Sequence, residues 1–239
     1  MTISCNNKVI LSLPSVFSDQ MILQRETEVS FWGKSNPKEK IIITGSWGSS
    51  SSTIADNSGK WQLKLSTPSA GGPHEVKVND SKNSITYKDV LIGEVWLASG
   101  QSNMQWKLNQ CKDCIDNQDD EIKNADYNQI RFFNNPTDLS GTIINSQKWK
   151  NVNPKDASEM EDSFSTENYS AVGYFFAKEL YNELNIPIGI IGSYWGGTRV
   201  EAWTSREKLN EITSVKLPLE EINEVIRMDR EEMELFYEN

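Results

Sequence analysis

Residues 93–104 (GEVWLASGQSNM) constrain the fold of this chain more than any other segment. The apolar residues 95–98 predict a buried strand, and the small residues after them predict a sharp turn. Ser102 would then lie at the carboxyl end of a strand, where open α/β sheets bind their ligands. A helix that begins at Asn103 would direct its first free N–H groups toward charge beside Ser102. The turn alone fits both an exposed nucleophile and a serine that caps the next helix.

A second turn of the same type, residues 193–203 (SYWGGTRVEAW), follows another apolar segment, residues 188–193. Because the carboxyl ends of parallel strands meet at one edge of a sheet, we expect both turns at that edge. The adjacent glycines Gly196 and Gly197 allow close backbone approach and leave N–H groups free to donate to an anion. The alternative is a tight strand-to-helix turn whose aromatic residues belong to the core. The expected pocket walls are Trp195 and Trp203.

The first 90 residues predict a β-rich module. Short apolar or alternating segments recur there and are separated by turn residues, which is typical of a small β-sandwich. A Gly-Gly-Pro turn at residues 71–73 is expected to lead into the last of these segments. The expected strands cover residues 29–32, 40–44, 60–65 and 74–78.

Residues 91–239 predict an α/β domain with a parallel sheet. Apolar residues recur with helical spacing across residues 168–184, and the apolar segment 188–193 follows directly. A helix followed by a buried strand is the βαβ pattern of parallel sheets. A further helix with one acidic face is expected over residues 220–236.

Composition and charge exclude several classes of partner. The net charge of −10 argues against nucleic acid and anionic membrane surfaces, which need clustered Lys and Arg. No apolar run is long enough to span a bilayer, and the segment after Lys8 reads as a strand. As the sequence stands, the chain reads as cytoplasmic, or as secreted, periplasmic or lysosomal if a leader was removed. Cys111 and Cys114 lack the second Cys/His pair of a zinc site, so we expect surface thiols or one local disulfide.

A serine nucleophile needs a base, and the sequence offers a poor choice of bases. The chain has one histidine, His74, which lies in the β-rich module away from both turns. Lys107 is near Ser102 in sequence, but nothing indicates burial that would remove its proton. Glu94 begins the strand that leads to Ser102, so we expect it at the opposite edge of the sheet.

Together, these segments resemble the sialate O-acetylesterase family of SGNH hydrolases. The strings GQSNM at residues 100–104, WGGT at 195–198 and EAW at 201–203 carry the resemblance. Their co-occurrence in order is more specific than any one motif. Further matching strings lie at residues 18–25, 71–73, 89–96 and 171–177.

The resemblance implies a β-sandwich-like module followed by a flavodoxin-like, three-layer α/β/α hydrolase domain. It implies hydrolysis of acetyl esters on sialic acids or related sugars, without a metal or other cofactor. Ser102 would be the nucleophile, and its N–H would form the oxyanion hole with Gly196 or Gly197. The expected substrate pocket comprises Gln101, Asn103, Trp195, Thr198 and Trp203.

The sequence also departs from this family. The family's later Gln-Gly-Glu-Ser-Asn segment and its terminal Asp-x-x-His, which supplies the base, are absent. The chain therefore resembles the front of a longer protein, cut inside the hydrolase domain, with an incomplete sheet and an exposed apolar edge. Three hypotheses remain: an esterase whose base comes from a C-terminal segment or a second chain, a catalytically silent carbohydrate-binding or interaction protein, and a non-functional fragment.

Overall fold

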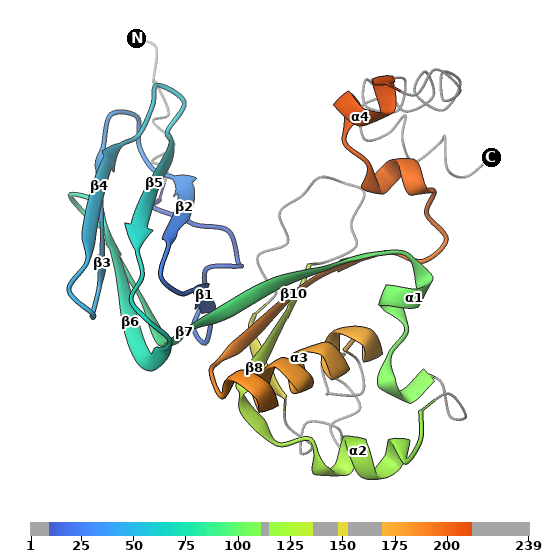
Figure 1. Ribbon diagram of the computed structural model, residues 1–239. Coiled ribbons are helices and arrows are strands. Elements are labelled where there is room, and N and C mark those ends of the chain that lie inside the picture. The colour runs from blue at the N-terminus through green and yellow to red at the C-terminus, as the bar shows by residue number, and fades with distance from the viewer. Residues whose placement is uncertain (1–9, 111–114, 136–147, 153–168, 212–239) are drawn as a thin grey trace.

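The computed structural model describes residues 10–110, 115–135, 148–152 and 169–211. It confirms the expected α/β class, because one large sheet combines parallel and antiparallel strand pairs with a few packed helices (Figure 1). Within these ranges, no helix has the length and apolar character needed to cross a membrane. The two cysteines at 111 and 114 and the helix expected over 220–236 lie outside the described residues.

Up to residue 100 the regular elements of the described chain are strands, and after it they are both strands and helices. The strands are β1 (Ile22–Gln24), β2 (Glu28–Lys34), β3 (Lys40–Gly45), β4 (Ser50–Ile54), β5 (Lys60–Ser66), β6 (Gly71–Asn79), β7 (Ser84–Gly100), β8 (Tyr127–Asn134), β9 (Lys150–Val152) and β10 (Ile188–Tyr194). The helices are α1 (Ser102–Gln105), α2 (Gln118–Asn124), α3 (Ala171–Leu184) and α4 (Arg206–Glu211), with 3₁₀ turns η1 (Leu108–Gln110) and η4 (Val200–Trp203).

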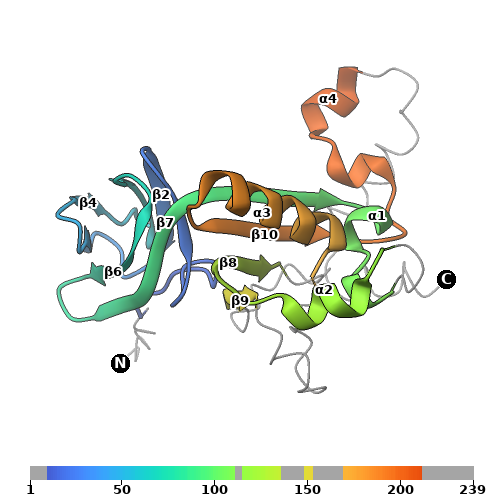
Figure 2. The same ribbon diagram turned by 60° about the horizontal axis from the view of Figure 1, so that its bottom comes forward.

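The 17-residue strand β7 runs through both halves of the structure (Figures 1 and 2). Its first half pairs antiparallel with β6, and its second half pairs parallel with β10. Among the described residues, the sheet has the order β4-β3-β6-β7-β10-β8-β9, with β1 beside β7. The predicted boundary between residues 90 and 91 therefore falls inside one continuous strand, and the division into two domains stays a prediction.

Successive residues of β7 point their backbone groups to opposite sides of the strand. Leu91 donates its N–H to the Met21 carbonyl oxygen at 3.1 Å, and the Gly93 carbonyl oxygen accepts from the Arg25 N–H at 2.9 Å, so both face β1. Glu94 instead donates its N–H to the Pro187 oxygen at 2.9 Å, toward β10. Hence β10 lies on the side opposite β1. Beyond Gly93, no strand of the described chain pairs with β7 on the β1 side.

This open edge corrects the prediction that residues 95–98 are buried. Ala98 is only 8% exposed, but Trp96 is 45% exposed and Leu97 is 67% exposed. The reason is the position of β7: helix α3 packs on β10 and β8, so β7 receives little cover. The Trp96 ring touches the rim of α3 through Phe176, with ring centroids 5.1 Å apart.

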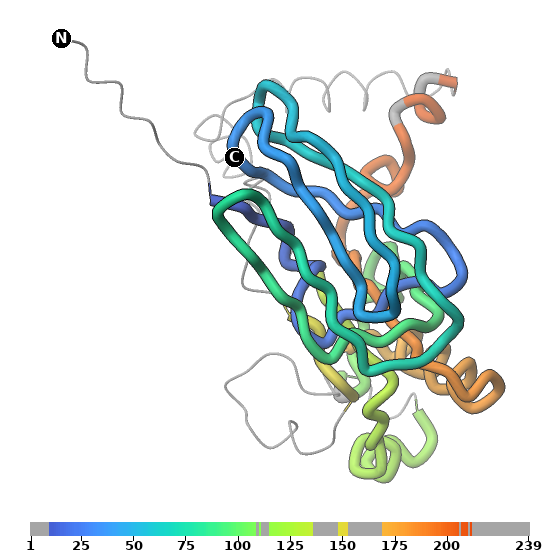
Figure 3. The backbone as a smooth tube through the Cα atoms, turned by 90° about the vertical axis from the view of Figure 1, so that its left-hand side faces the viewer, coloured from blue at the N-terminus to red at the C-terminus, as the bar shows by residue number. Residues whose placement is uncertain are grey.

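The N-terminal strands enclose a hydrophobic core between two sheets. The two-stranded sheet β2-β5 lies against β3, β4 and β6, whose hairpins run side by side in Figure 3. The expected alternation over residues 60–65 is confirmed in β5, where Trp61, Leu63 and Leu65 are buried and their neighbours are exposed. Residues 71–73 are not a separate turn, because they form the start of β6.

A second core cluster lies between α3 and strands β8 and β10. Helix α3 begins at Ala171, later than predicted, because the Ser170 hydroxyl caps it by accepting the Gly173 N–H at 3.1 Å. The strand expected over residues 188–193 is confirmed as β10. Its apolar sequence follows from its central place between β7 and β8.

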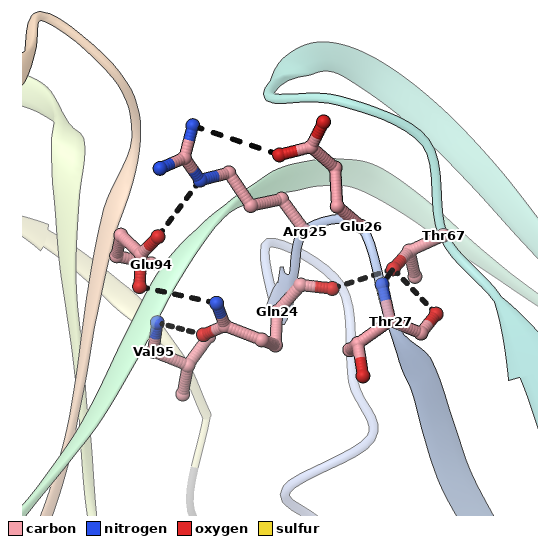
Figure 4. A network of polar contacts seen from close by, with 7 residues as sticks. All are labelled: Gln24, Arg25, Glu26, Thr27, Thr67, Glu94 and Val95. Carbon is pink, nitrogen blue, oxygen red and sulfur yellow. Dashed lines mark hydrogen bonds and ion pairs between the residues drawn. The ribbon is translucent and has the colours of Figure 1, made fainter.

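A polar network joins β1 to β7 at the point where the edge opens (Figure 4). The Gln24 carboxamide oxygen accepts the Val95 N–H at 2.8 Å, and its nitrogen donates to a Glu94 oxygen at 3.1 Å. Arg25 Nε donates to the other Glu94 oxygen at 2.7 Å. The Gln24 side chain thus supplies the acceptor that a neighbouring strand would offer to the Val95 N–H, just beyond the residues of β7 that pair with β1. The hydrogen bonds from Gln24 and then Arg25 lower the pKa of Glu94 below its ordinary value of 4.5.

The open edge has a measurable signature in amide hydrogen exchange. The Trp96 and Ala98 N–H groups point toward β10, whereas those of Leu97 and Ser99 point to the open side. We expect Leu97 and Ser99 to exchange about tenfold or more faster than Trp96 and Ala98, because only the latter are held in the ladder. Residue-resolved exchange measures this, and equal protection of all four amides would contradict the open edge.

The Glu94 network predicts a pH-dependent contribution to stability. Because folding lowers the pKa of Glu94, its stabilisation is complete above the unfolded-state pKa and declines as the pH falls through the folded-state value. Glu94→Gln should lower the free energy of unfolding by about 1 kcal/mol at neutral pH and by much less near pH ~3. Urea unfolding at both pH values measures the difference. Glu28→Gln, at the exposed start of β2, is the control and should change little at either pH.

Candidate functional site

Ser102 lies in the turn that follows β7. Gly100 ends the strand with a φ of 145°, a conformation that L side chains rarely adopt, and Gln101 caps α1 without a side-chain hydrogen bond. The sequence predicted a helix from Asn103, but the helix begins one residue earlier, at Ser102. Ser102 is therefore inside the first turn of the helix, which excludes the interpretation of this serine as the cap. Its side chain is exposed.

The turn after β10 lies directly beside Ser102. The parallel register places Tyr194 opposite Gly100, and the Trp195 N–H donates to the Gly100 oxygen at 2.9 Å. Gly196 then approaches α1 so closely that a Cβ atom built on it would lie 3.1 Å from Ser102 Oγ. Gly197 has a φ of 81° and open space around its Cα. The structure therefore brings Ser102 together with the two glycines' turn, with Gly196 nearer.

Gln105 is a site residue that the sequence reasoning missed. Its side-chain oxygen accepts the Gly196 N–H at 2.5 Å, so the nearest candidate donor for an anion already has an acceptor. The signal was present, because Gln105 follows Ser102 by three positions and residues at that spacing share a helix face. Neither turn by itself shows which partner would meet that face.

The remaining residues of the second turn hold one another in place. The Thr198 hydroxyl donates to the Trp195 oxygen at 2.7 Å and accepts from Trp203 Nε1 at 2.8 Å. These contacts fix the loop between β10 and η4, and both tryptophans are half-buried. The side chains of Gln101 and Asn103 are exposed beside Ser102. Their roles as pocket residues stay predictions.

Below the turn, a tyrosine–asparagine pair anchors the end of β10 to β8. The Tyr194 hydroxyl donates to Asn134 Oδ1 at 2.9 Å, and burial raises the pKa of Tyr194. Gly192 leaves room for this pair, since a Cβ built there would lie 2.5 Å from Asn134 Oδ1. This hydrogen bond anchors the end of β10, two residues before Gly196, and so helps to hold the Gly196 turn beside Ser102.

Two cavities of the described structure lie away from Ser102. A cavity of about 800 Å³ lies in the N-terminal half beside Trp32, and one of about 590 Å³ lies beside Tyr87 and Trp149. Neither is lined by Ser102 or by the Gly196 turn. In the described ranges, no group of three or more His, Cys, Asp and Glu residues is placed to hold a metal ion.

No histidine of this chain can reach Ser102. His74 is the single histidine of the sequence and pairs with Val90 in the β6–β7 ladder. From Val90 to Gly100 the strand rises about 3.3 Å per residue, which separates His74 from the Ser102 turn by roughly 30 Å. Its ring packs on Trp47, with centroids 5.3 Å apart. Glu94 also lies away from Ser102 along β7, as expected. Its carboxylate accepts hydrogen bonds from Gln24 and Arg25.

The chain is 33% identical to the sialate O-acetylesterase of Pongo abelii and 32% identical to that of Homo sapiens, in each case over 82% of this chain and 39% of the relative. A carbohydrate acetylesterase from Xanthomonas citri has the same fold, with a TM-score of 0.73 and 33% identity over 84% of this chain and 44% of that one. No family model matches the sequence.

The chain spans about two fifths of the length of the curated relatives that it matches. The resemblance inferred from the sequence motifs is confirmed by these relatives and by the solved structure. Over the region that it shares with them, the chain is similar in sequence to the sialate O-acetylesterases.

Proposed function

We propose that Ser102 is the nucleophile of a carbohydrate O-acetylesterase whose substrate is an acetylated sugar, a sialic acid or a related glycan. The observation that carries this proposal is the approach of the Gly196 turn to Ser102 at the carboxyl ends of two parallel strands. A nucleophile with neighbouring backbone N–H groups at such an edge is the arrangement that acyl transfer needs. The printed activities of the relatives support the same reaction class.

In the proposed mechanism, Ser102 Oγ attacks the acetyl carbonyl carbon, and a base takes the hydroxyl proton. The N–H groups of Ser102 and of Gly196, with Gly197 beside it, stabilise the negative charge on the carbonyl oxygen. The base then returns the proton to the sugar oxygen, the ester bond breaks, and acetyl-Ser102 remains. Water attacks this ester and releases acetate, which restores the serine.

His74 cannot be the general base of this mechanism, because the rise of β7 places it roughly 30 Å from Ser102. We infer that a C-terminal segment of a longer chain, or a second chain, supplies it. The open edge of β7 above β1 is where such a polypeptide would dock. There, the backbone groups of Leu97 and Ser99 face outward, and Trp96 and Leu97 expose apolar surface on the two faces.

The same proposal accounts for the architecture. Residues 1–90 would be a β-sandwich-like module, supported by the two sheets around its core. Residues 91–239 would be the first part of a flavodoxin-like α/β/α domain, supported by the parallel strands β7, β10 and β8 and by α3. An added strand on β7 would move that strand from the edge toward the centre of the sheet.

A direct test uses an external base to replace the missing one. With imidazole and 4-nitrophenyl acetate, we expect acetylation of Ser102, detected by intact-mass and peptide mass spectrometry. Ser102→Ala should lower the protein-dependent rate about tenfold or more, because the Ser102 hydroxyl is exposed and lies beside the Gly196 turn. Ser69→Ala, an exposed serine in the turn after β5, is the matched control. Equal rates for Ser102→Ala and the unchanged protein would refute the nucleophile.

The second candidate is a catalytically silent carbohydrate-binding protein, which the distant histidine favours. Titration calorimetry of the folded chain with O-acetylated sialosides separates the two. Binding without acetylation of Ser102, even with imidazole present, would support the silent protein. Acetylation of Ser102 that depends on the sugar ester would support the esterase.

A further inference from the structure

The N–H group of Gly196 is occupied by an oxygen of the same chemical type as the acyl oxygen that it would bind. Gln105 Oε1 accepts this N–H at 2.5 Å. A carboxamide oxygen and an ester carbonyl oxygen are both neutral sp² acceptors, and a carboxylate oxygen is a charged version of the same acceptor. Gln105 therefore occupies the position at which an acyl oxygen would receive this hydrogen bond.

The geometry places the occupied N–H beside Ser102. A Cβ atom built on Gly196 would lie 2.7 Å from Gln105 Oε1 and 3.1 Å from Ser102 Oγ. Both side chains reach the glycine from the same short helix, α1, and face the turn after β10. The gap between Ser102 and the Gly196 backbone is thus shared by the serine hydroxyl and the carboxamide.

Backbone hydrogen bonds hold α1 in place, so rotation of the Gln105 side chain is the smallest change that would release the N–H. The Gln105 N–H donates to the Gln101 oxygen at 3.0 Å, and the Trp106 N–H donates to the Ser102 oxygen at 2.9 Å. The Trp106 oxygen in turn accepts the Ala171 N–H at 2.8 Å, which ties α1 to the start of α3. A rotation of the Gln105 side chain opens the N–H without moving Ser102.

We propose that Gln105 is a displaceable occupant of the Gly196 N–H, and that the carboxylate of acetate, or the oxyanion formed from an acetyl ester, is the ligand class that displaces it. This inference rests on the proposed function, because it assigns the acyl-oxygen position of the same site. Exchange of a carboxamide oxygen for a neutral carbonyl oxygen gains little. Exchange for a charged oxygen gains, because hydrogen bonds to ionised acceptors are stronger.

The cost of displacing Gln105 is the same for every acceptor, so only an acceptor that gains more than this cost from the Gly196 N–H, as a charged oxygen does, would displace it. Interactions that strengthen as negative charge develops lower the barrier to reaction, whereas equal binding of substrate and transition state does not. Gln105 would accept this N–H when no ligand is bound and would be displaced when negative charge develops on the acyl oxygen.

The test follows the Gly196 amide signal in nitrogen-15 NMR spectra during a titration with sodium acetate at constant ionic strength. Gln105→Met keeps the length of the side chain but removes the oxygen, and it should bind acetate about fivefold more tightly. Gln105→Glu places a charged acceptor on the N–H, so it should bind acetate about fivefold more weakly at neutral pH.

The control is Gln62→Ala, on the exposed face of β5, which should leave the acetate titration unchanged. Equal acetate affinity in the unchanged protein and in both Gln105 variants would overturn the displacement proposal. So would the absence of any acetate-dependent shift of the Gly196 signal in all three proteins. Acetylation of Ser102 with imidazole reports separately on the nucleophile, so that failure of this inference and failure of the proposed function give different results.

Discussion

The parallel ladder between β7 and β10 is the constraint on which the candidate site depends. Its register places Tyr194 beside Gly100, so the two strands end side by side and the turns that follow them begin next to each other. The Trp195–Gly100 hydrogen bond then continues the ladder by one step into the turns. Ser102 and Gly196 meet for this reason, although they are 94 residues apart in a sequence in which neither segment specifies the other.

The same strand bears on our proposal that the general base comes from another segment or a second chain. On one side, β7 is covered by β6 and then by β10, but on the other side the described chain offers only the short strand β1. The Gln24 carboxamide satisfies the Val95 N–H, and the edge stays open above it. A single polypeptide docked there would cover the exposed side chains of Trp96 and Leu97 and bring new residues toward the turn of Ser102. In our proposal, the polypeptide that covers this edge is also the one that supplies the base.

Gln105 shows how an unliganded site can satisfy its own donors. A buried or half-buried N–H without an acceptor is costly, and a catalytic N–H is by its purpose an unsatisfied donor. A neutral side-chain oxygen on a short, well-anchored helix resolves this conflict, because it satisfies the donor at rest and competes weakly with charge. Under our proposal, the contact between α1 and the β10 turn would therefore take part in the chemistry as well as in the packing.

Much of the fold was accessible from the sequence by itself. Alternation in residues 60–65 and the apolar segment 188–193 predicted β5 and β10, because local periodicity reports which side chains face a core. The motifs around Ser102 and Gly196 predicted the family and the pairing of the two turns. The single histidine was also visible in the sequence, and with it the shortage of a base.

Only the tertiary structure decided the features that depend on neighbours distant in the chain. Residues 95–98 read as buried, but Trp96 and Leu97 are exposed, since burial depends on which strands and helices lie beside β7. The Gln105–Gly196 hydrogen bond depends on where β10 ends relative to β7, which no local pattern encodes. Local sequence patterns thus indicated the strands and the turn of Ser102, whereas the register between strands determined which oxygen meets which N–H.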